Sequence, residues 1–299
     1  MNNFSQRRIS IIMPSYQQAG YIEESINSVL SLKYDNIEFI VVDGGSTDGT
    51  KEILQKYSGF FSKLIIEHDK GQSDAIQKGI RAATGDFITW INSDDLLMPD
   101  FVSNILSYFD NNPQIDFIYG NCEIIDSNSN RVGVHYGNDV QWPNILLEHH
   151  LPIPQQGATW RKAVTDNIEG PKIKYHYVLD REYFLRIIAN YKSMYVDICL
   201  GKFRYHPEAK SIKHQMKWIS ELKVSYKELC DELSIKNKNR ALVLSSVSIH
   251  CGYIFLSGRE YISFLKCLYD GILYDKFIFF RPYTYKKIIH KIRRVIINE

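Results

Sequence analysis

Cysteine is scarce in this sequence of 299 residues, and no two cysteines stand at CxxC spacing. The five that occur are scattered and odd in number: Cys122, Cys199, Cys230, Cys251 and Cys267. This usage argues against a disulfide framework and a zinc site, and it predicts a reducing compartment. The polar residues 1–8 also lack the apolar segment of an export signal. We therefore expect the protein to be cytoplasmic.

Long apolar runs are missing as well. The longest uncharged stretch, residues 241–258, is interrupted by serines, His250 and Gly252. It is too short and too polar to predict a membrane span, so we expect a buried helix there. Hydrophobic residues make up 44% of the chain, enough for a full core in one large domain or two. The net charge of +2 excludes no class of partner.

Short apolar segments alternate with helical patterns through the first third of the chain. Strands are predicted at 9–13, 37–43, 63–67 and 87–91, and helices at 21–32, 51–57 and 75–83. This alternation predicts an α/β fold with a mostly parallel central sheet flanked by helices on both faces. In such sheets, ligands bind beyond the carboxyl ends of the strands.

Acidic residues stand at those carboxyl ends. Asp43, Asp69 and the adjacent pair Asp94 and Asp95 all lie at the carboxyl ends of predicted strands. Mg²⁺ and Mn²⁺ take one or two carboxylates and complete their coordination with phosphate oxygens and water, so this edge suits a cation beside a polyphosphate. The alternative is a solvated turn that caps a helix beginning near Asp100. The other acids on the same edge favour the binding site.

Four blocks carry a resemblance to a known family. They are Ile-Ile-Met-Pro-Ser-Tyr at 11–16, Val-Val-Asp-Gly-Gly-Ser-Thr-Asp-Gly-Thr at 41–50, Asp-Lys-Gly-Gln-Ser-Asp-Ala at 69–75 and Asn-Ser-Asp-Asp at 92–95. In order and spacing over residues 1–110, these blocks resemble the family 2 glycosyltransferases, which have the GT-A fold and use nucleotide sugars. The resemblance implies a Rossmann-like sheet with a nucleotide-sugar site at its edge.

The resemblance extends to individual residues of the donor site. It implies that the nucleotide sugar contacts Pro14, Ser15, Tyr16, Asp43, Gly71, Gln72, Asp74, Asn92, Asp94 and His206. Asp94 and Asp95 match the Asp-x-Asp element and, with His206, imply a bound Mn²⁺ or Mg²⁺; a lone surface histidine is the alternative for His206. Many relatives carry a second aspartate that faces the base where this chain has Gly44. A uridine or guanosine diphosphate sugar remains the expected donor.

A catalytic base is also implied, at the start of a helix in the second half of the domain. Residues 178–186 fit that pattern, with Asp180 as the base and Glu182 as a supporting or acceptor-contacting residue. A base that takes the proton of the attacking hydroxyl contributes roughly 10²- to 10⁴-fold; the alternative for Asp180 is a helix N-cap. Gln156 and Trp160 resemble an acceptor-side strand, where they would meet a sugar, although Trp160 suits a core position equally well.

Two regions are expected along the chain. Residues 1–211 would form the GT-A catalytic domain, with a nucleotide-sugar half at 1–110 and an acceptor half at 111–211, and residues 212–299 a helical extension. Within the extension, residues 276–294 carry seven Lys or Arg and no acid among aromatic residues. This pattern suits peripheral contact with an anionic membrane. The resemblance favours that contact, at the inner face, because family members often act on lipid-linked glycans there. A solvated helix packed on the core is the alternative, and nucleic acid is disfavoured because no recognition motif accompanies the charge.

The resemblance, together with these acids, implies a metal-dependent glycosyltransferase, and inversion of the anomeric centre is implied by the resemblance alone. Such an enzyme would move a sugar from a nucleoside-diphosphate sugar to a hydroxyl of a glycan or lipid-linked acceptor, in surface polysaccharide or lipopolysaccharide synthesis, and its oligomeric state is open. A sugar nucleotidyltransferase would need a Gly-rich phosphate loop near the first strand, which residues 13–20 lack. A catalytically silent nucleotide- or glycan-binding protein would have lost the acids, yet Asp94, Asp95 and Asp180 are present.

Overall fold

The computed structural model describes residues 7–148, 151–206, 215–235, 237–258 and 260–278. The chain divides into two compact units, here called the sheet unit (Met1–Val140 with Pro152–Lys213) and the helical unit (Gln141–Leu151 with His214–Glu299). The division falls beside the boundary proposed between residues 211 and 212. The inclusion of residues 141–151 in the helical unit was not foreseen, because nothing in that short segment marks which unit it packs on.

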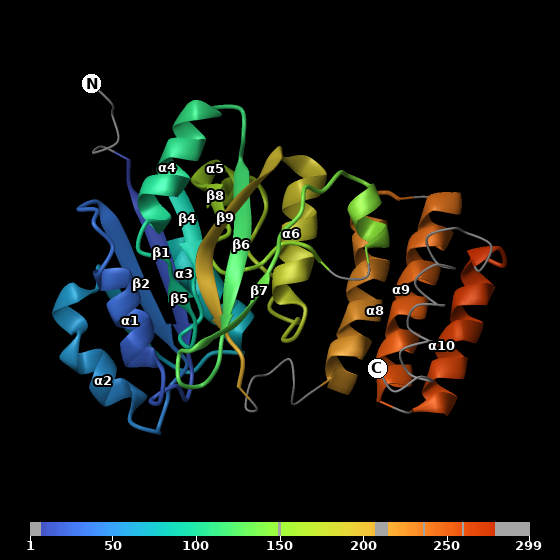
Figure 1. Cartoon of the computed structure of the whole chain (residues 1–299), viewed down its shortest axis with the longest axis horizontal. Coiled ribbons are helices and arrows are strands. Elements are labelled where there is room, and N and C mark those ends of the chain that lie inside the picture. The colour runs from blue at the N-terminus through green and yellow to red at the C-terminus, as the bar shows by residue number, and fades with distance from the viewer. Residues whose placement is uncertain (1–6, 149–150, 207–214, 236, 259, 279–299) are drawn as a thin grey trace. The chain divides into compact units, whose positions relative to one another are not determined.

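The first four strands of the sheet unit are parallel, as the alternating pattern predicts (Figure 1). They are β1 (Ile9–Ser15), β2 (Ile37–Asp43), β3 (Lys63–Ile66) and β4 (Phe87–Trp90). β1 lies between β2 and β4, and β3 pairs with β2 on the outside. The register pairs Ser15 with Asp43 and Asp43 with Ile66, so these strands end at one edge. The chain segments that follow these strands therefore gather there.

The second half of the sheet is mixed. Its strands are β5 (Leu96–Leu97), β6 (Phe117–Ile125), β7 (Arg131–His135), β8 (Thr159–Arg161) and β9 (Ser193–Arg204). The order is β3-β2-β1-β4-β8-β6-β9-β5, with β7 paired to β6. Only β6 and β9 are parallel here; β8, β7 and β5 run antiparallel to their neighbours. The polar composition of residues 126–139 suggests a turn, yet this segment contains β7. The residues of β7 are at most partly buried, so the strand tolerates polar side chains.

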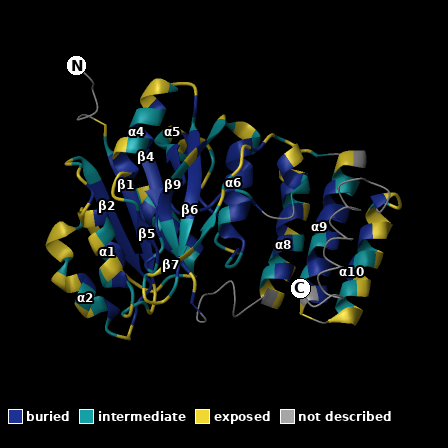
Figure 2. Cartoon of the chain, viewed as in Figure 1, coloured by how far each residue is buried: buried dark blue, intermediate teal, exposed yellow. Residues whose placement is uncertain are grey.

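Helices cover both faces of this sheet. They are α1 (Ile22–Leu30), α2 (Thr50–Lys56), α3 (Gln72–Ala82), α4 (Phe101–Asn111), α5 (Lys162–Asn167) and α6 (Leu179–Asn190), with a short 3₁₀ turn, η2 (Ser58–Phe60). Alternate residues of β1 serve the two faces. Ile9 and Ile11 join the core cluster with α1 and α4, whereas a Cβ added to Gly79 of α3 would lie 2.3 Å from Cγ2 of Ile12. Figure 2 shows the central strands as buried between these layers.

A buried carboxylate lies near the amino ends of β1 and β2, at the edge of the sheet opposite to the candidate site. Glu38 of β2 accepts hydrogen bonds from Ser10 Oγ (2.5 Å) and from the backbone N and Oγ1 of Thr84 (2.7 and 2.8 Å), and Arg8 Nη2 lies 3.4 Å away. Burial alone would raise the pKa of Glu38, but these donors and the charge of Arg8 outweigh burial and lower it. Glu38 therefore remains a carboxylate inside the sheet unit.

The helical unit contains η3 (Asn144–Leu147), α8 (Gln215–Glu232), α9 (Asn237–Ser257) and α10 (Tyr261–Tyr274). α9 covers the predicted buried helix at 241–258, and Ile249 and Cys251 on it are fully buried. Ser245 Oγ donates to the carbonyl oxygen of Gly271 (2.7 Å), where the missing side chain lets α9 and α10 approach closely. Among the described helices, none combines the length and apolar character needed to cross a bilayer.

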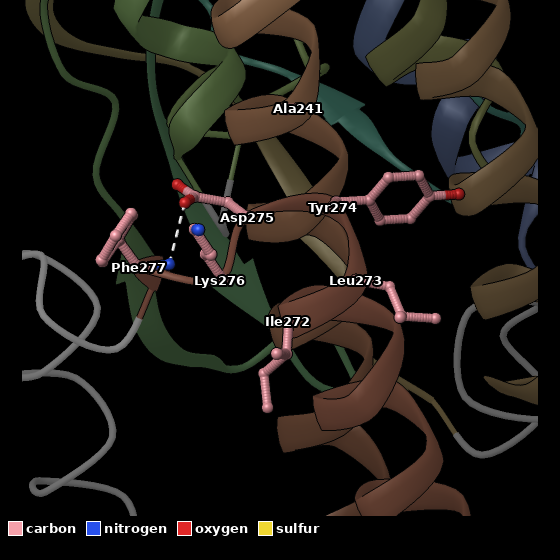
Figure 3. Close-up of a pocket in the computed structure, with 7 residues that line it drawn as sticks. All are labelled: Ala241, Ile272, Leu273, Tyr274, Asp275, Lys276 and Phe277. Carbon is pink, nitrogen blue, oxygen red and sulfur yellow. Dashed lines mark hydrogen bonds between the residues drawn. The ribbon is translucent and has the colours of Figure 1, made fainter.

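A hollow of about 390 Å³ lies at the end of α10 (Figure 3). It is lined by Ala241 and by residues 272–277, and the Asp275 carboxylate accepts a hydrogen bond from the backbone N of Phe277 there (3.0 Å). None of the residues proposed from the sequence for donor, metal or acceptor binding lines it. The candidate site is instead the strand edge of the sheet unit.

Candidate functional site

Asp43, at the end of β2, organises the loop that follows it. The residue is fully buried. Its Oδ1 accepts hydrogen bonds from the backbone N of Gly45 (3.0 Å) and Ser46 (2.8 Å), and its Oδ2 accepts one from Ser46 Oγ (2.6 Å). Such local bonds fix a turn. Asp43 thus shapes residues 44–46 and does not present an exposed carboxylate to a ligand.

The segment after β1 is joined to this loop. Gln17 N donates to Ser46 Oγ (2.8 Å), and the Gln17 amide exchanges hydrogen bonds with Thr47 (2.8 and 3.1 Å). Pro14 and Ser15 belong to β1, and the buried Ser15 Oγ has no hydrogen-bond partner in the described part of the chain. Tyr16 is 60% exposed. The ends of β1 and β2 therefore form one connected rim from which the Tyr16 ring projects.

Asp69 follows β3, and its side chain lies against this rim. Its Oδ1 accepts a hydrogen bond from Gly71 N (2.8 Å). Its Oδ2 would lie 2.7 Å from a Cβ added to Gly44. The absence of a side chain at Gly44 is what leaves room for the carboxylate.

The start of α3 is built from the predicted 71–74 segment. Gly71 has φ +110°, and a Cβ there would meet His176 Nδ1 at 2.7 Å. Asp74 accepts a hydrogen bond from Lys70 N (3.0 Å) and lies 3.6 Å from Lys78 Nζ. Its carboxylate therefore stabilises the first turn of α3. A direct contact between Asp74 and the donor stays a prediction.

Side-chain amides connect α3 to the Asp94–Asp95 turn. Gln72 Nε2 donates to Asn92 Oδ1 (2.8 Å), and Asn92 Nδ2 donates to Asp95 Oδ2 (2.9 Å) and to Gln155 Oε1 (3.1 Å). Gln156 Nε2 donates to the same Asp95 oxygen (2.8 Å). These neutral side chains hold a buried carboxylate in one orientation.

Asp95 is itself almost completely buried. Besides the amides, the backbone N of Arg204 donates to its Oδ1 (2.9 Å). Burial, and then the neighbouring charge of Asp94, raise the pKa of Asp95 to about 8. With both oxygens engaged, Asp95 supports the turn, and its role as a metal ligand stays a prediction.

Asp94 and His206 face each other across the site. Asp94 Oδ2 lies 3.2 Å from His206 Nε2, and the Asp94 side chain keeps 21% of its surface exposed. The His206 ring packs against Tyr21, with 5.0 Å between ring centroids. Within the described residues, no group of three or more His, Cys, Asp or Glu could hold a metal ion by itself. Two ligands still fit a hard cation that takes its other ligands from phosphate oxygens and water.

Arg204, at the end of β9, holds these parts together. Its guanidinium is fully buried; Nε donates to the Asp94 carbonyl oxygen (2.8 Å) and Nη2 to Glu24 Oε2 (2.6 Å). Nη1 donates to Ser129 Oγ (2.8 Å) and to the Asp126 carbonyl oxygen (3.2 Å). The side chain thereby links α1, the β6–β7 turn and the Asp94–Asp95 turn. No role for Arg204 was predicted from the sequence, because the partners of its side chain are distant along the chain.

Asp180 lies in the first turn of α6 and is half-buried. Its Oδ1 accepts a hydrogen bond from Arg181 N (2.7 Å), and burial raises its pKa. The segment before α6 is fastened to α3, since Ser73 Oγ donates to the Tyr175 carbonyl oxygen (2.5 Å) and Gln77 Nε2 to that of Pro171 (3.0 Å). Asp180 is thereby tied to the helix that carries Gln72.

Three predicted contacts are corrected by burial. Glu182 is fully buried in a double hydrogen bond to Arg186 (2.6 and 3.1 Å), with Lys172 Nζ at 3.3 Å, so it supports α6 and is closed to an acceptor. Trp160 is fully buried against Trp90 and has no face for a sugar, which is the core alternative. Gln156 is also buried, and its amide N–H serves Asp95.

Comparison with known proteins agrees with this geometry. The family model of glycosyl transferase family 2 matches residues 10–170, more than half of the chain. The chain belongs to this family. The match includes the strand edge and the Asp94–Asp95 turn and ends before Asp180 and His206, which lie outside it.

Relatives of similar sequence are glycosyltransferases. The chain is 38% identical over 122 residues to the Escherichia coli UDP-Glc:alpha-D-GlcNAc-diphosphoundecaprenol beta-1,3-glucosyltransferase WfgD, covering 40% of this chain and 48% of WfgD. It is 30% identical over 156 residues to an uncharacterized glycosyltransferase of Nostoc sp., covering 51% and 47%. The chain thus matches only about half the length of these curated relatives.

Solved structures share the fold. The Staphylococcus aureus TarS 1-349 complex with UDP-GlcNAc superposes with a TM-score of 0.65 at 17% identity, over 89% of this chain and 81% of that one. The mannosyltransferase PcManGT from Pyrobaculum calidifontis, in complex with GDP-Man and Mn²⁺, gives 0.56 at 14% identity, over 89% and 86%. The α/β fold of this family 2 glycosyltransferase is therefore of the GT-A type.

Proposed function

We propose that this family 2 glycosyltransferase moves a sugar, with inversion, from a nucleoside-diphosphate sugar to a hydroxyl of a glycan or lipid-linked acceptor in surface polysaccharide or lipopolysaccharide synthesis. The observation that carries this is the pairing of the partly exposed Asp94 with His206 at the strand edge, at 3.2 Å. The donor named for WfgD and the ligand bound to TarS are both UDP-sugars, and the acceptor named for WfgD is lipid-linked. These support the donor and acceptor classes.

The residues divide the chemistry between them. Asp94 and His206 would hold Mn²⁺ or Mg²⁺, which when bound offsets the negative charge that develops on the leaving diphosphate. Asp180 accepts the proton of the acceptor hydroxyl as that oxygen bonds to the anomeric carbon and the bond to the diphosphate breaks on the opposite face. Burial raises the pKa of Asp180, which makes the carboxylate a stronger base. The amides around Asn92 and Asp95 keep the turn rigid throughout.

The test uses the full chain with UDP- and GDP-sugars, Mn²⁺, and free and lipid-linked glycan acceptors, with release of nucleoside diphosphate as the signal. Asp180→Asn should lower kcat by roughly 10²- to 10⁴-fold while leaving donor affinity close to wild type. The matched control is Asp166→Asn, an exposed aspartate of α5. Equal rates for Asp180→Asn and the control would exclude Asp180 as the base. Nucleotide binding without turnover of any sugar would favour the silent binding protein.

Asp94→Asn tests the cation. In wild type, Mn²⁺ should increase the thermal stabilisation given by UDP or GDP, because a ligand that binds only the folded state raises its melting temperature. The variant should lose that increase, whereas Asp100→Asn, an exposed aspartate beyond the same turn, should keep it. An undiminished Mn²⁺ effect in Asp94→Asn would remove Asp94 from the metal site.

Membrane contact is the remaining part of the proposal. α10 exposes apolar side chains in one stripe: Ile262 (85%), Leu265 (61%), Tyr269 (61%) and Leu273 (65%). Their spacing places them on one side of the helix. The basic stretch 276–294 that follows lies, beyond residue 278, outside the described residues. An apolar stripe followed by Lys and Arg suits an anionic lipid surface.

Vesicle sedimentation tests this contact. The protein should bind vesicles that contain phosphatidylglycerol more strongly than pure phosphatidylcholine, and Leu265→Gln with Leu273→Gln should weaken that binding. Val224→Gln in α8, another exposed apolar position (50%), is the control. Failure to bind anionic vesicles at low salt would overturn the membrane proposal without affecting the donor site.

A further inference from the structure

The segment that leads to Asp180 is held in place by side chains. Residues 168–178 form neither helix nor strand, so their backbone carbonyl oxygens have no partners within a regular element. From α6, Arg186 donates to the carbonyl oxygens of Glu169 (3.0 Å) and Gly170 (2.9 Å). The first part of the segment is thereby fixed to the helix that carries Asp180.

The other contacts with this segment come from one side of α3. Ser73 Oγ donates to the carbonyl oxygen of Tyr175 (2.5 Å), and Gln77 Nε2 donates to that of Pro171 (3.0 Å). Residues four apart lie on the same side of a helix. Gln77 Oε1 in turn accepts a hydrogen bond from Arg81 Nη1 (3.1 Å). This bond orients the Gln77 amide, so that its N–H group points to the segment.

The same helix also contacts the Asp94–Asp95 turn. Gln72, in the first turn of α3, donates to Asn92 Oδ1 (2.8 Å), and Asn92 Nδ2 donates to Asp95 Oδ2 (2.9 Å). α3 is continuous from Gln72 to Ala82, so its backbone hydrogen bonds keep the contacts at its start and its middle at a fixed separation. One rigid element therefore connects the two parts of the site.

We propose that Gln77 and Ser73 are positioning residues, which set the place of the Asp180 carboxylate relative to the Asp94–Asp95 turn. This inference rests on the proposed function, because it takes Asp180 as the base. Each residue acts through the backbone carbonyl oxygen that it holds. A base must lie within about 2.6–3.2 Å of the oxygen whose proton it accepts, and a misplacement of about 1 Å can lower the rate by roughly 10²-fold.

Apolar packing places α6 on the sheet but does not give this alignment. Tyr183 and Phe184 of α6 pack against Trp90 of β4, with 5.9 and 5.4 Å between ring centroids. Such packing has no preferred direction. The hydrogen bonds from α3 are directional, and they fix the backbone directly before the turn of α6 in which Asp180 lies. The α3 contacts are therefore the ones suited to place a carboxylate accurately.

The main variant is Gln77→Met, which removes the amide but keeps an unbranched side chain of similar helix propensity. In the assay of nucleoside-diphosphate release, kcat should fall by roughly 10- to 100-fold, while the dissociation constant of UDP or GDP with Mn²⁺ should stay close to wild type. Gln77→Glu should have the same effect at neutral pH, because an ionised carboxylate cannot donate to Pro171. Gln55→Met, at an exposed glutamine of α2, is the matched control and should keep kcat.

A double-mutant cycle separates positioning from general destabilisation. If Gln77 acts through Asp180, Gln77→Met should lower kcat by at most about 2-fold when Asp180 is already asparagine, because the base that it positions is missing. A purely structural role would lower kcat by the same factor with or without Asp180. That result would overturn the inference.

Ser73→Ala tests the second contact. It removes one hydroxyl from a fully buried position and should also lower kcat with little change in donor affinity, with melting temperatures showing that each variant is folded. Unchanged kcat in folded Gln77→Met and Ser73→Ala would overturn this inference alone. Wild-type kcat in Asp180→Asn, or a wild type that turns over no nucleotide sugar, would overturn the proposed function together with it.

Discussion

Arg204→Lys tests whether one buried guanidinium holds the Asp94–Asp95 turn in place. The side chain makes four hydrogen bonds, to Asp94 O, Asp126 O, Ser129 Oγ and Glu24 Oε2, over 2.6–3.2 Å. Lysine keeps the charge but concentrates it in one ammonium group on a flexible stem. It cannot reach acceptors that lie on three separate elements.

The expected loss follows from those bonds. Two or three of the four are broken, each contributing about 0.5–1.5 kcal/mol, so the free energy of unfolding should fall by about 1–4.5 kcal/mol. The pair with Glu24 adds little, because the Glu24 side chain is 45% exposed and its charge is screened by solvent. For a unit of this size, each kcal/mol lowers the melting temperature by roughly 2–4 °C.

Thermal unfolding and turnover should both be measured. Because Arg204 Nε binds the Asp94 carbonyl oxygen, the folded variant should also show weaker stabilisation by nucleotide and Mn²⁺. Arg131→Lys is the control, because the Arg131 side chain is 60% exposed and its ion pair with Glu123 is long, at 3.4 Å. Its effect on the free energy of unfolding should remain within about 0.5 kcal/mol. Equal melting temperatures for Arg204→Lys and the control would refute the role of Arg204.

Three buried contacts away from the turn give further tests. Since the folded pKa of Glu38 is lowered, its carboxylate stabilises the protein above about pH 4.5 and loses that effect as the pH falls through the folded pKa. The difference in melting temperature between wild type and Glu38→Gln should therefore disappear on acidification. Glu52→Gln, at an exposed position, should show no such difference at any pH. Glu182→Gln should cost about 3–5 kcal/mol in chemical denaturation by leaving the buried guanidinium of Arg186 without its counter-ion, yet keep turnover when folded. A loss of turnover without destabilisation would restore a catalytic role. Gly79→Ala should destabilise by about 1–3 kcal/mol through overpacking, and Ile12→Val, which retains Cγ2, should not relieve it.

The sequence was informative about which chain segments reach the edge. The strand at 37–43 is β2 itself, and the helix expected at 75–83 is α3, which begins earlier because Asp74 and Gly71 order residues 72–74. The spacing of apolar and polar residues reflects the local geometry of a helix or strand, so it can be recognised from a single sequence. The antiparallel insertion of β8 between β4 and β6 was not predicted, because that pairing depends on contacts between distant segments.

Side-chain direction was much less predictable. Asp43 and Asp95 lie at strand ends just as Asp69 and Asp94 do, yet both turn inward. Asp43 accepts from the nearby Ser46 N, whereas Asp95 accepts from the distant Arg204 N. A run of acids in the sequence shows where carboxylates gather. Only the folded structure shows which of them already accept hydrogen bonds from the protein at both oxygens. The same holds for Glu182, whose partner Arg186 was visible in sequence at i+4 but whose complete burial was not.

The acids whose oxygens are occupied by protein donors explain how the more exposed Asp94 could bind a ligand. A cation site with only Asp94 and His206 as protein ligands depends on the turn remaining still while phosphate arrives, because each further ligand comes from the substrate or water. Asp95 fixes that turn through Asn92, Gln156 and the backbone of Arg204. The neutral amides would do this without adding charge beside the proposed cation, so the negative potential would stay at Asp94. The buried residues thus prepare the site, and the few exposed residues at the edge remain to recognise the donor.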